Sequence, residues 1–191
     1  MNWKGWTALS VGCLVVGLMA GISSVSWAEG DDLAKESEAK AESTAGTKPT
    51  IDMIIKNVDK ACELLEKEGT EAFPKFQGKD SDFIFAGTYI WIHDLDGIML
   101  MHPIKAAMNG KPILNFKDAN GKRFFSEMNE LVKEKGAGWV DYMWPKPGEK
   151  NPSLKISYVK LCKSKDGKDL VAGCGVYNLS ESDIASIKSK N

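Results

Sequence analysis

The stretch GWVDYMWPKPGEKNPSLKISYV, residues 138–159, decides the fold and points to the kind of function. Apolar and aromatic residues alternate on both sides of a Pro-Lys-Pro-Gly corner, which is typical of two half-buried β-strands joined by a turn. The stretch combines lysines with aromatic residues, namely Tyr142, Trp144, Lys146, Lys155 and Tyr158. Aromatic walls with a few cations and hydroxyls suit a small-molecule pocket better than a catalytic centre, so the stretch favours a binding protein.

The N-terminus has the layout of a secretory signal peptide. Lys4 is followed by an apolar run from Trp6 to about Val25, and Ser26-Trp27-Ala28 places small residues at positions −3 and −1 of a cleavage site. The sequence therefore predicts a signal peptide over residues 1–28 and an exported, periplasmic mature chain. An uncleaved membrane anchor is the alternative, because about 20 apolar residues can span a bilayer.

The charge of the chain is nearly balanced. Its formal net charge is −1, and removal of residues 1–28 takes away one lysine and no acid. Such a balance gives no reason to expect nucleic acid or an anionic membrane surface as a partner. A solvated surface explains nearly all of the lysines.

Three of the four cysteines, Cys62, Cys162 and Cys174, lie beyond the predicted signal peptide. No Cys-x-x-Cys motif is present, so the sequence supports neither thioredoxin chemistry nor a zinc knuckle nor a c-type haem. Cys162 and Cys174 flank a predicted hairpin turn at residues 165–168, and their even spacing places both on one sheet face. Either they form a cross-strand disulfide or they are small buried apolar residues.

The rest of the chain divides into a linker and one domain. Residues 29–50 are rich in Glu, Lys, Ala, Ser and Thr and predict a disordered or loosely helical linker. Apolar spacing predicts helices over 51–67 and 122–135, and alternation predicts strands over 88–93, 98–102, 138–144, 154–162 and 170–177. We therefore expect an α+β domain over 51–191, with a five-stranded antiparallel sheet of PAS-like layout, a long N-terminal helix and a connector helix.

Several of these segments, in this order, resemble the single Cache domain, an extracytoplasmic PAS-like sensor module. They are TYIWIHDLDGIMLMHP, KDANGKRFFSEMNEL, GWVDYMWPKPG, LKISYVK and VAGCGVY. The resemblance covers about residues 51–177. It implies a pocket on one sheet face, under the loop between the second strand and the connector helix. It also implies a small organic acid ligand such as acetate, propionate, lactate or pyruvate.

Chemoreceptors and histidine kinases carry this family of domain between two transmembrane helices. Here the last residues, SESDIASIKSKN, are polar where a receptor would enter its second membrane helix. We therefore expect a free periplasmic binder that passes its ligand state to a membrane-bound signalling partner. A homodimer through the N-terminal helix is a further possible assembly.

Strand parity selects the candidate ligand-binding residues, because alternate side chains point to opposite faces of a sheet. Lys155 and Tyr158 cannot both enter a pocket from a regular strand, so either the strand is bulged or one of them is structural. We assign Lys155 to the ligand, since a buried lysine needs a partner that a carboxylate would supply, and Tyr158 to the core. The predicted ligand-binding residues are Lys155, His102, Tyr142, Trp144 and Tyr89.

Each of these residues also has a structural interpretation. Lys155 could be a lysine on a sheet edge, and His102 could cap a strand end. Tyr142 and Tyr89 could serve core packing alone, although a phenol is suited to orient a small acid. Trp144 fits a pocket wall better than a hydrogen-bond donor.

An enzyme, a metal site or a cofactor site finds little support in the sequence. Gly-x-Ser-x-Gly, His-Glu-x-x-His and a phosphate-binding glycine loop are all missing, and the chain contains two histidines. His93, Asp94 and Asp96 could suggest a metal, but Asp-x-Asp-Gly between two strands is usually a turn. A non-catalytic protein-docking module with an empty or vestigial pocket remains the alternative to a ligand sensor.

Overall fold

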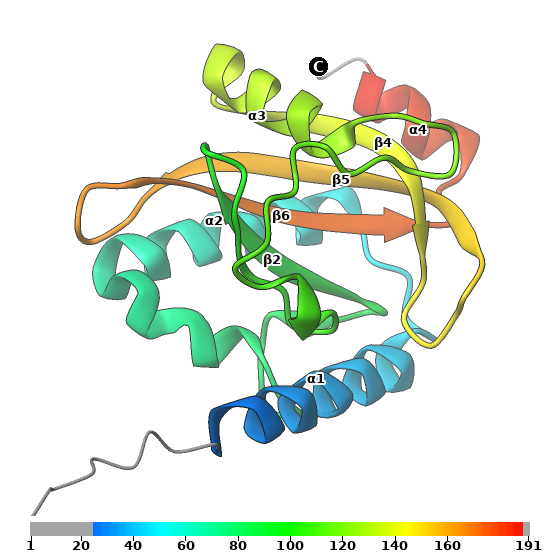
Figure 1. Cartoon of the computed structure of the whole chain (residues 1–191). Helices are drawn as coiled ribbons and strands as arrows, with labels where there is room; N and C mark the ends of the chain where they lie inside the picture. The colour runs from blue at the N-terminus through cyan, green and yellow to red at the C-terminus, as the bar shows by residue number, and fades with distance from the viewer. Residues whose placement is uncertain (1–24, 189–191) are drawn as a thin grey trace, which may run out of the picture.

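An antiparallel sheet forms the middle of the computed structural model, which describes residues 25–188 (Figure 1). Its strands run in the order β1-β2-β6-β5-β4, and β3 pairs with β2 off this path. The strands are β1 Ile84–Phe85, β2 Thr88–Asp94, β3 Met99–Met101, β4 Ala137–Pro145, β5 Pro152–Lys163 and β6 Asp169–Tyr177. The helices within the described range are α1 Val25–Thr44, α2 Ile51–Glu68, α3 Phe124–Lys135 and α4 Glu181–Lys188, with 3-10 helices η1 Gly69–Phe76 and η2 Ala106–Met108.

The two faces of the sheet carry separate apolar clusters. On one face α2 buries Ile54, Val58, Ala61 and Leu65, whose spacing of three and four residues forms one side of a helix. On the other face α3 and the loop between β3 and α3 pack against the sheet. Residues of β5 alternate between the two clusters, as the period of a strand requires. The candidate ligand-binding residues all lie on the α3 face or at its margin.

The predicted α+β, PAS-like architecture is confirmed. The first predicted helix corresponds to α2, the connector helix to α3, and the last three predicted strands to β4, β5 and β6. The second predicted strand is shorter than expected, because the regular pairing with β2 is limited to Met99–Met101 and shifts in register beside Ile92 and His93. The sequence did not predict β1 or α4.

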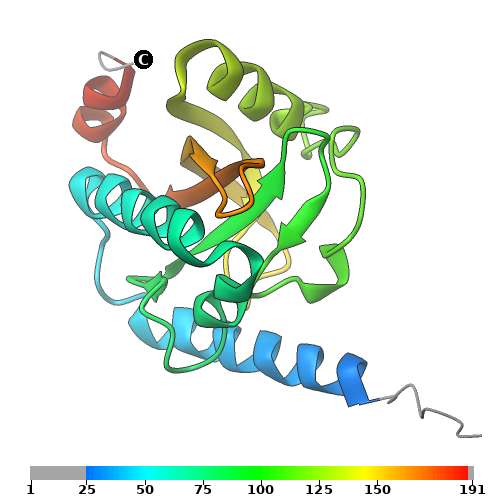
Figure 2. The same cartoon turned by 90° about the vertical axis from the view of Figure 1, so that its left-hand side faces the viewer.

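Residues 29–50, predicted as a disordered or loosely helical linker, are mostly helical: α1 occupies most of this segment and lies across one end of the sheet (Figures 1 and 2). α1 docks mainly through polar contacts. The Ser37 hydroxyl accepts a hydrogen bond from the Gly78 amide at 2.8 Å, and the Thr44 hydroxyl accepts one from the Gly87 amide at 3.0 Å. A helix held in this way has no apolar stripe, so its pattern resembles that of a disordered segment.

The predicted signal peptide lies almost entirely outside the described residues, and it stays a prediction. The predicted cleavage after Ala28 falls in the first turn of α1. No helix within residues 25–188 is both long enough and apolar enough to cross a membrane.

A disulfide joins the two layers of the α2 face. Cys62 on α2 is bonded to Cys162 on β5, with an S–S distance of 1.99 Å. The alternative pair of Cys162 with Cys174 is excluded, because the two residues share a face but are not cross-strand neighbours. The residue opposite Cys162 is Leu170, and the residue opposite Cys174 is Tyr158. Cys174 is a free, buried thiol, as the second interpretation expected.

The Asp-x-Asp-Gly motif forms a hairpin turn between β2 and β3. The Asp94 carboxylate accepts the Ile98 amide hydrogen at 2.7 Å, and Gly97 has a φ of 81°. A side chain at Gly97 would also collide with Leu114, so the glycine is required on two grounds. Asp94, the first acidic residue of the motif, therefore stabilises the turn of the backbone.

Candidate ligand-binding site

The five predicted residues come together on the α3 face of the sheet. Side chains from β2, β4 and β5 meet there, and the loop after β3 closes over them. With their neighbours they form a group that we call the Lys155 cluster. It consists of Lys155, Tyr89, Trp91, His102, Tyr142, Trp144, Ser157 and Tyr177.

Lys155 is the centre of this cluster. β5 lies between β4 and β6, and the Lys155 side chain is only 1 % exposed, which excludes the interpretation as an edge lysine. Its Nζ donates a hydrogen bond to the Tyr89 hydroxyl at 3.3 Å and lies 4.4 Å from the centre of that ring. The rings of Tyr177 and Trp91 lie 5.1 Å and 5.2 Å from the same atom. Lys155 is thus enclosed by aromatic faces, which attract a cation.

The ammonium group of Lys155 lacks an ionic partner. Within residues 25–188, no carboxylate forms an ion pair with it. Burial, with a smaller contribution from the nearby charge of Lys105, lowers the pKa of Lys155 to about 7. A buried charge without a counter-charge is costly, so an anion placed beside it would be strongly favoured.

The regular pairing of β5 decides between the two alternatives for Lys155 and Tyr158. Pairing with β4 and with β6 continues without a shift through both residues. Tyr158 therefore points to the α2 face, where its ring lies 5.2 Å from that of Trp139. Tyr158 is half-buried and packs against the apolar cluster of the α2 face, away from Lys155.

Hydroxyl groups line the side of the cluster that faces β4. The hydroxyls of Tyr142 and Ser157 lie 3.0 Å apart, and the Tyr142 ring stacks on Phe124 of α3 at 4.2 Å. Trp144 packs against Phe124 in an edge-to-face contact, with ring centres 5.6 Å apart. Burial raises the pKa of Tyr89 and of Tyr142 above the usual value for a phenol, so both remain protonated donors at neutral pH.

His102 caps the end of β3, which is one of the two roles between which the sequence left a choice; its role as a ligand donor stays a prediction. Its Nδ1 accepts the backbone amide hydrogen of Lys105 at 2.9 Å, which fixes the chain just after β3. Burial, together with Lys155 and Lys105, lowers the pKa of His102 well below its usual value. The ring is therefore neutral and carries its proton on Nε2, while its centre lies 5.0 Å from that of Tyr89. This N–H is a further donor at the cluster.

Sequence reasoning did not assign four residues of the site. Tyr177, Ser157 and Trp91 lie within the segments that resemble a Cache domain, but none of them was predicted to bind the ligand. Lys105, whose Nζ lies 4.5 Å from the Trp144 ring, lies in the loop after β3. The indole nitrogen of Trp91 is buried and has no hydrogen-bond partner among residues 25–188. Its parity with Tyr89 could have placed it on the same face of the sheet.

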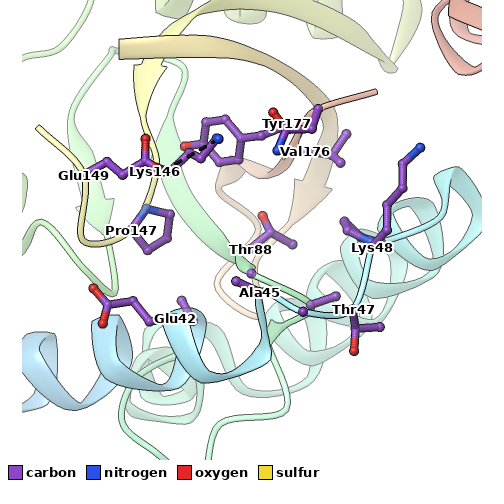
Figure 3. A pocket seen from close by; sticks show the side chains of 16 residues that line it. Glu42, Ala45, Thr47, Lys48, Thr88, Lys146, Pro147, Glu149, Val176 and Tyr177 are labelled. Atoms are coloured by element: carbon purple, nitrogen blue, oxygen red, sulfur yellow. Dashed lines mark ion pairs between the residues drawn. The ribbon is translucent and has the colours of Figure 1, made fainter. Parts of the chain in front are cut away.

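A surface cavity of about 430 Å³ adjoins the Lys155 cluster (Figure 3). We call it the α1 cavity, because it lies between the end of α1, the turn before β2, the β4–β5 loop and the end of β6. None of the five predicted ligand-binding residues lines it, whereas Tyr177 of the cluster does. Lys146 also lines it and forms an ion pair with Glu149 at 3.7 Å.

A family model described as a Cache domain matches residues 39–183. The chain belongs to the Cache domain family. The match begins within α1, before the boundary predicted at residue 51, and ends within α4. The resemblance seen in the sequence motifs is thereby confirmed.

Two proteins are similar to part of this Cache domain. The methyl-accepting chemotaxis protein McpP of Pseudomonas putida is 38 % identical over 89 residues, which is 47 % of this chain and 16 % of that protein. The sensor histidine kinase MctS of Rhizobium johnstonii is 32 % identical over 89 residues, 47 % of this chain and 18 % of that protein. This chain thus spans less than a fifth of the length of either relative.

A solved structure resembles the domain over most of its length. It is a Cache chemosensory domain whose structure is described as the basis for carboxylic acid recognition. It is 31 % identical, with a TM-score of 0.51, and the likeness covers 76 % of this chain and 96 % of that chain.

Proposed function

We propose that this Cache domain binds a short-chain carboxylate of the acetate, propionate, lactate or pyruvate type through the Lys155 cluster. The observation that carries the proposal is the buried ammonium of Lys155, which has aromatic neighbours and one phenolic hydrogen bond but no carboxylate partner among the described residues. A ligand carboxylate would supply the missing charge. The role is one of binding, without catalysis.

The neighbours of Lys155 suit an anion. Tyr89, Tyr142 and neutral His102 offer hydrogen-bond donors, and Lys105 adds a second cation at the margin. Hydrogen bonds to an ionised acceptor are stronger than those to a neutral one, so these donors would favour the carboxylate over its protonated acid. The solved Cache domain connected with carboxylic acid recognition supports the same ligand class.

The proposed role in the cell is that of a periplasmic sensor domain. The relatives are a chemotaxis receptor and a sensor histidine kinase, which supports a function in signal transduction across a membrane. We propose that the ligand state of this domain is passed to a membrane-bound signalling partner. Dimerisation through α2, the helix predicted at the N-terminus of the domain, would provide one route by which the ligand state reaches the partner.

A thermal-shift series tests the proposal. A ligand that binds only the folded state stabilises it and so raises the melting temperature. The stabilisation is about 2.7 kcal/mol when the ligand concentration is 100 times the dissociation constant. At least one straight-chain or hydroxy acid of two to four carbons is expected to stabilise the purified protein, and the matching amides are not. If no acid stabilises the protein, the result would contradict carboxylate binding and favour the protein-docking interpretation.

Ligand affinity is expected to depend on pH through Lys155. Its pKa of about 7 in the free protein means that the charged form is lost as the pH rises above 7. A bound carboxylate raises this pKa, so binding above pH 7 takes up a proton and the affinity falls by up to about tenfold per pH unit. Below pH 7 the affinity should level off.

Calorimetric titrations in two buffers of different ionisation enthalpy measure this proton uptake. Approximately one proton is expected at pH 8.5 and close to none at pH 6. Lys160→Met is the matched control, because Lys160 lies on the same strand but on the opposite face, where it pairs with Asp59, and it should leave the proton uptake unchanged. Affinity that does not change from pH 6 to pH 9 would contradict the assignment.

A further inference from the structure

The α1 cavity is built from segments that are distant in the sequence. Ala45 at the end of α1, Thr88 at the start of β2, Pro147 in the β4–β5 loop and Val176 on β6 all line it (Figure 3). Its volume of about 430 Å³ lies within the range of about 300–1,000 Å³ that is usual for small-molecule sites. The cavity is therefore large enough to hold part of an organic ligand.

Tyr177 belongs to both the α1 cavity and the Lys155 cluster. Its side chain lines the cavity, and the centre of its ring lies 5.1 Å from Lys155 Nζ. Lys155 itself does not line the cavity. The ring thus stands between the open space and the ammonium group.

The position of the Tyr177 ring is fixed at both of its ends. The backbone of Tyr177 pairs with Lys155 in the β5–β6 ladder, and its hydroxyl donates a hydrogen bond to the Pro145 carbonyl at 2.8 Å. Because the ring is held by β4, β5 and β6 together, it acts as a rigid wall.

We propose that Tyr177 sets the maximum length of the acid that the site accepts, by separating the Lys155 cluster from the α1 cavity. This inference rests on the proposed function. When the carboxylate of a short acid is held at Lys155, its carbon chain either reaches the Tyr177 ring or ends before it. Without the ring, a longer chain would continue into the cavity, where Ala45, Pro147 and Val176 offer apolar surface.

Tyr177→Ala is expected to extend the ligand range from short acids to straight-chain acids of five to eight carbons. Each additional methylene that becomes buried should strengthen binding by about fourfold. Calorimetric titration of the full chain with acetate, propionate, hexanoate and octanoate measures the change. For the wild type, hexanoate and octanoate should bind at least tenfold more weakly than the best short acid.

Three variants separate the removal of the wall from other effects. Tyr177→Phe keeps the ring but loses the bond to Pro145, and it should retain the preference for short acids. Tyr177→Leu is a second, less disruptive opening of the wall. Ala45→Phe in the Tyr177→Ala background fills the cavity from the far side and should cancel the gain, while Ala45→Phe alone should leave the binding of short acids unchanged.

The outcomes distinguish this inference from the function on which it rests. If the wild type binds no short acid, the proposed function fails, and the length limit fails with it. If the wild type binds short acids but Tyr177→Ala and Tyr177→Leu bind hexanoate and octanoate no more tightly than the wild type, only the inference about Tyr177 is overturned. A gain that persists with Ala45→Phe also overturns it, since the chain would then lie elsewhere.

Discussion

Replacing Lys155 by methionine is expected to weaken the binding of short-chain carboxylates by about 100-fold or more. Removal of one partner of a buried, hydrogen-bonded charge pair costs about 2–5 kcal/mol, and here the ligand would lose its only fully buried counter-charge. Methionine preserves most of the length and apolar volume of the lysine side chain. The loss should therefore reflect charge rather than packing, and isothermal titration calorimetry measures it.

The folded state of the same variant is expected to be as stable as the wild type or more stable. Burial lowers the pKa of Lys155, so the unfolded chain binds more protons than the folded one from about pH 7 up to the ordinary pKa of lysine. Stability of the unliganded wild type should rise across that range, and methionine should remove this rise. Chemical denaturation at pH 6 and pH 9 compares the two proteins.

Lys160→Met is the matched control. Lys160 is on the same strand but on the opposite face, where it forms an ion pair with Asp59 at 2.6 Å. It should leave ligand affinity unchanged. Equal losses in both variants, or undiminished binding by Lys155→Met, would show that Lys155 is not the carboxylate partner.

Removal of the disulfide by Cys62→Ala with Cys162→Ala is expected to reduce the free energy of unfolding by about 2–5 kcal/mol. The bond closes a loop with a sequence separation of 100 residues, and a cross-link over a long loop restricts the unfolded chain more than one over a short loop. Urea denaturation, followed by tryptophan fluorescence, measures the difference.

A reducing agent provides the internal control for this prediction. It should lower the stability of the wild type by a similar amount and have no effect on the double variant, whose remaining described cysteine is Cys174. Thiol labelling of the unfolded wild type under non-reducing conditions should leave Cys62 and Cys162 unmodified. Labelling of both residues would show that the bond does not form in solution.

Local sequence patterns predicted most of the fold. The apolar spacing of α2 and the alternation of β4 and β5 were strong signals, because each element buries one face against the core. α1 was missed for the opposite reason. Its contacts with the rest of the domain include Ser37, Ala41 and Thr44, which are small or polar. The spacing of these three residues by four and three positions is the signal that could have revealed a buried helix face.

The candidate site was predicted as far as parity within single strands allows. Parity placed Tyr142 with Trp144 and set Lys155 opposite Tyr158, and the register of β5 agrees. It could not place Tyr177 beside Lys155, because that contact depends on the pairing of β5 with β6. It could not predict the disulfide either, since Cys62 and Cys162 meet only when α2 packs on the sheet.

The disulfide connects α2 to the sheet, but α3 and the loop after β3 are held to the other face, and α1 to one end of the sheet, without a covalent bond in the described residues. A ligand can reach a lysine that is 1 % exposed only when part of that second layer opens. Such an opening breaks non-covalent contacts alone, so it requires far less energy than global unfolding. We therefore expect the two faces of one sheet to differ in their dynamics: one is a cross-linked base, and the other should open to admit the proposed ligand while the base remains folded.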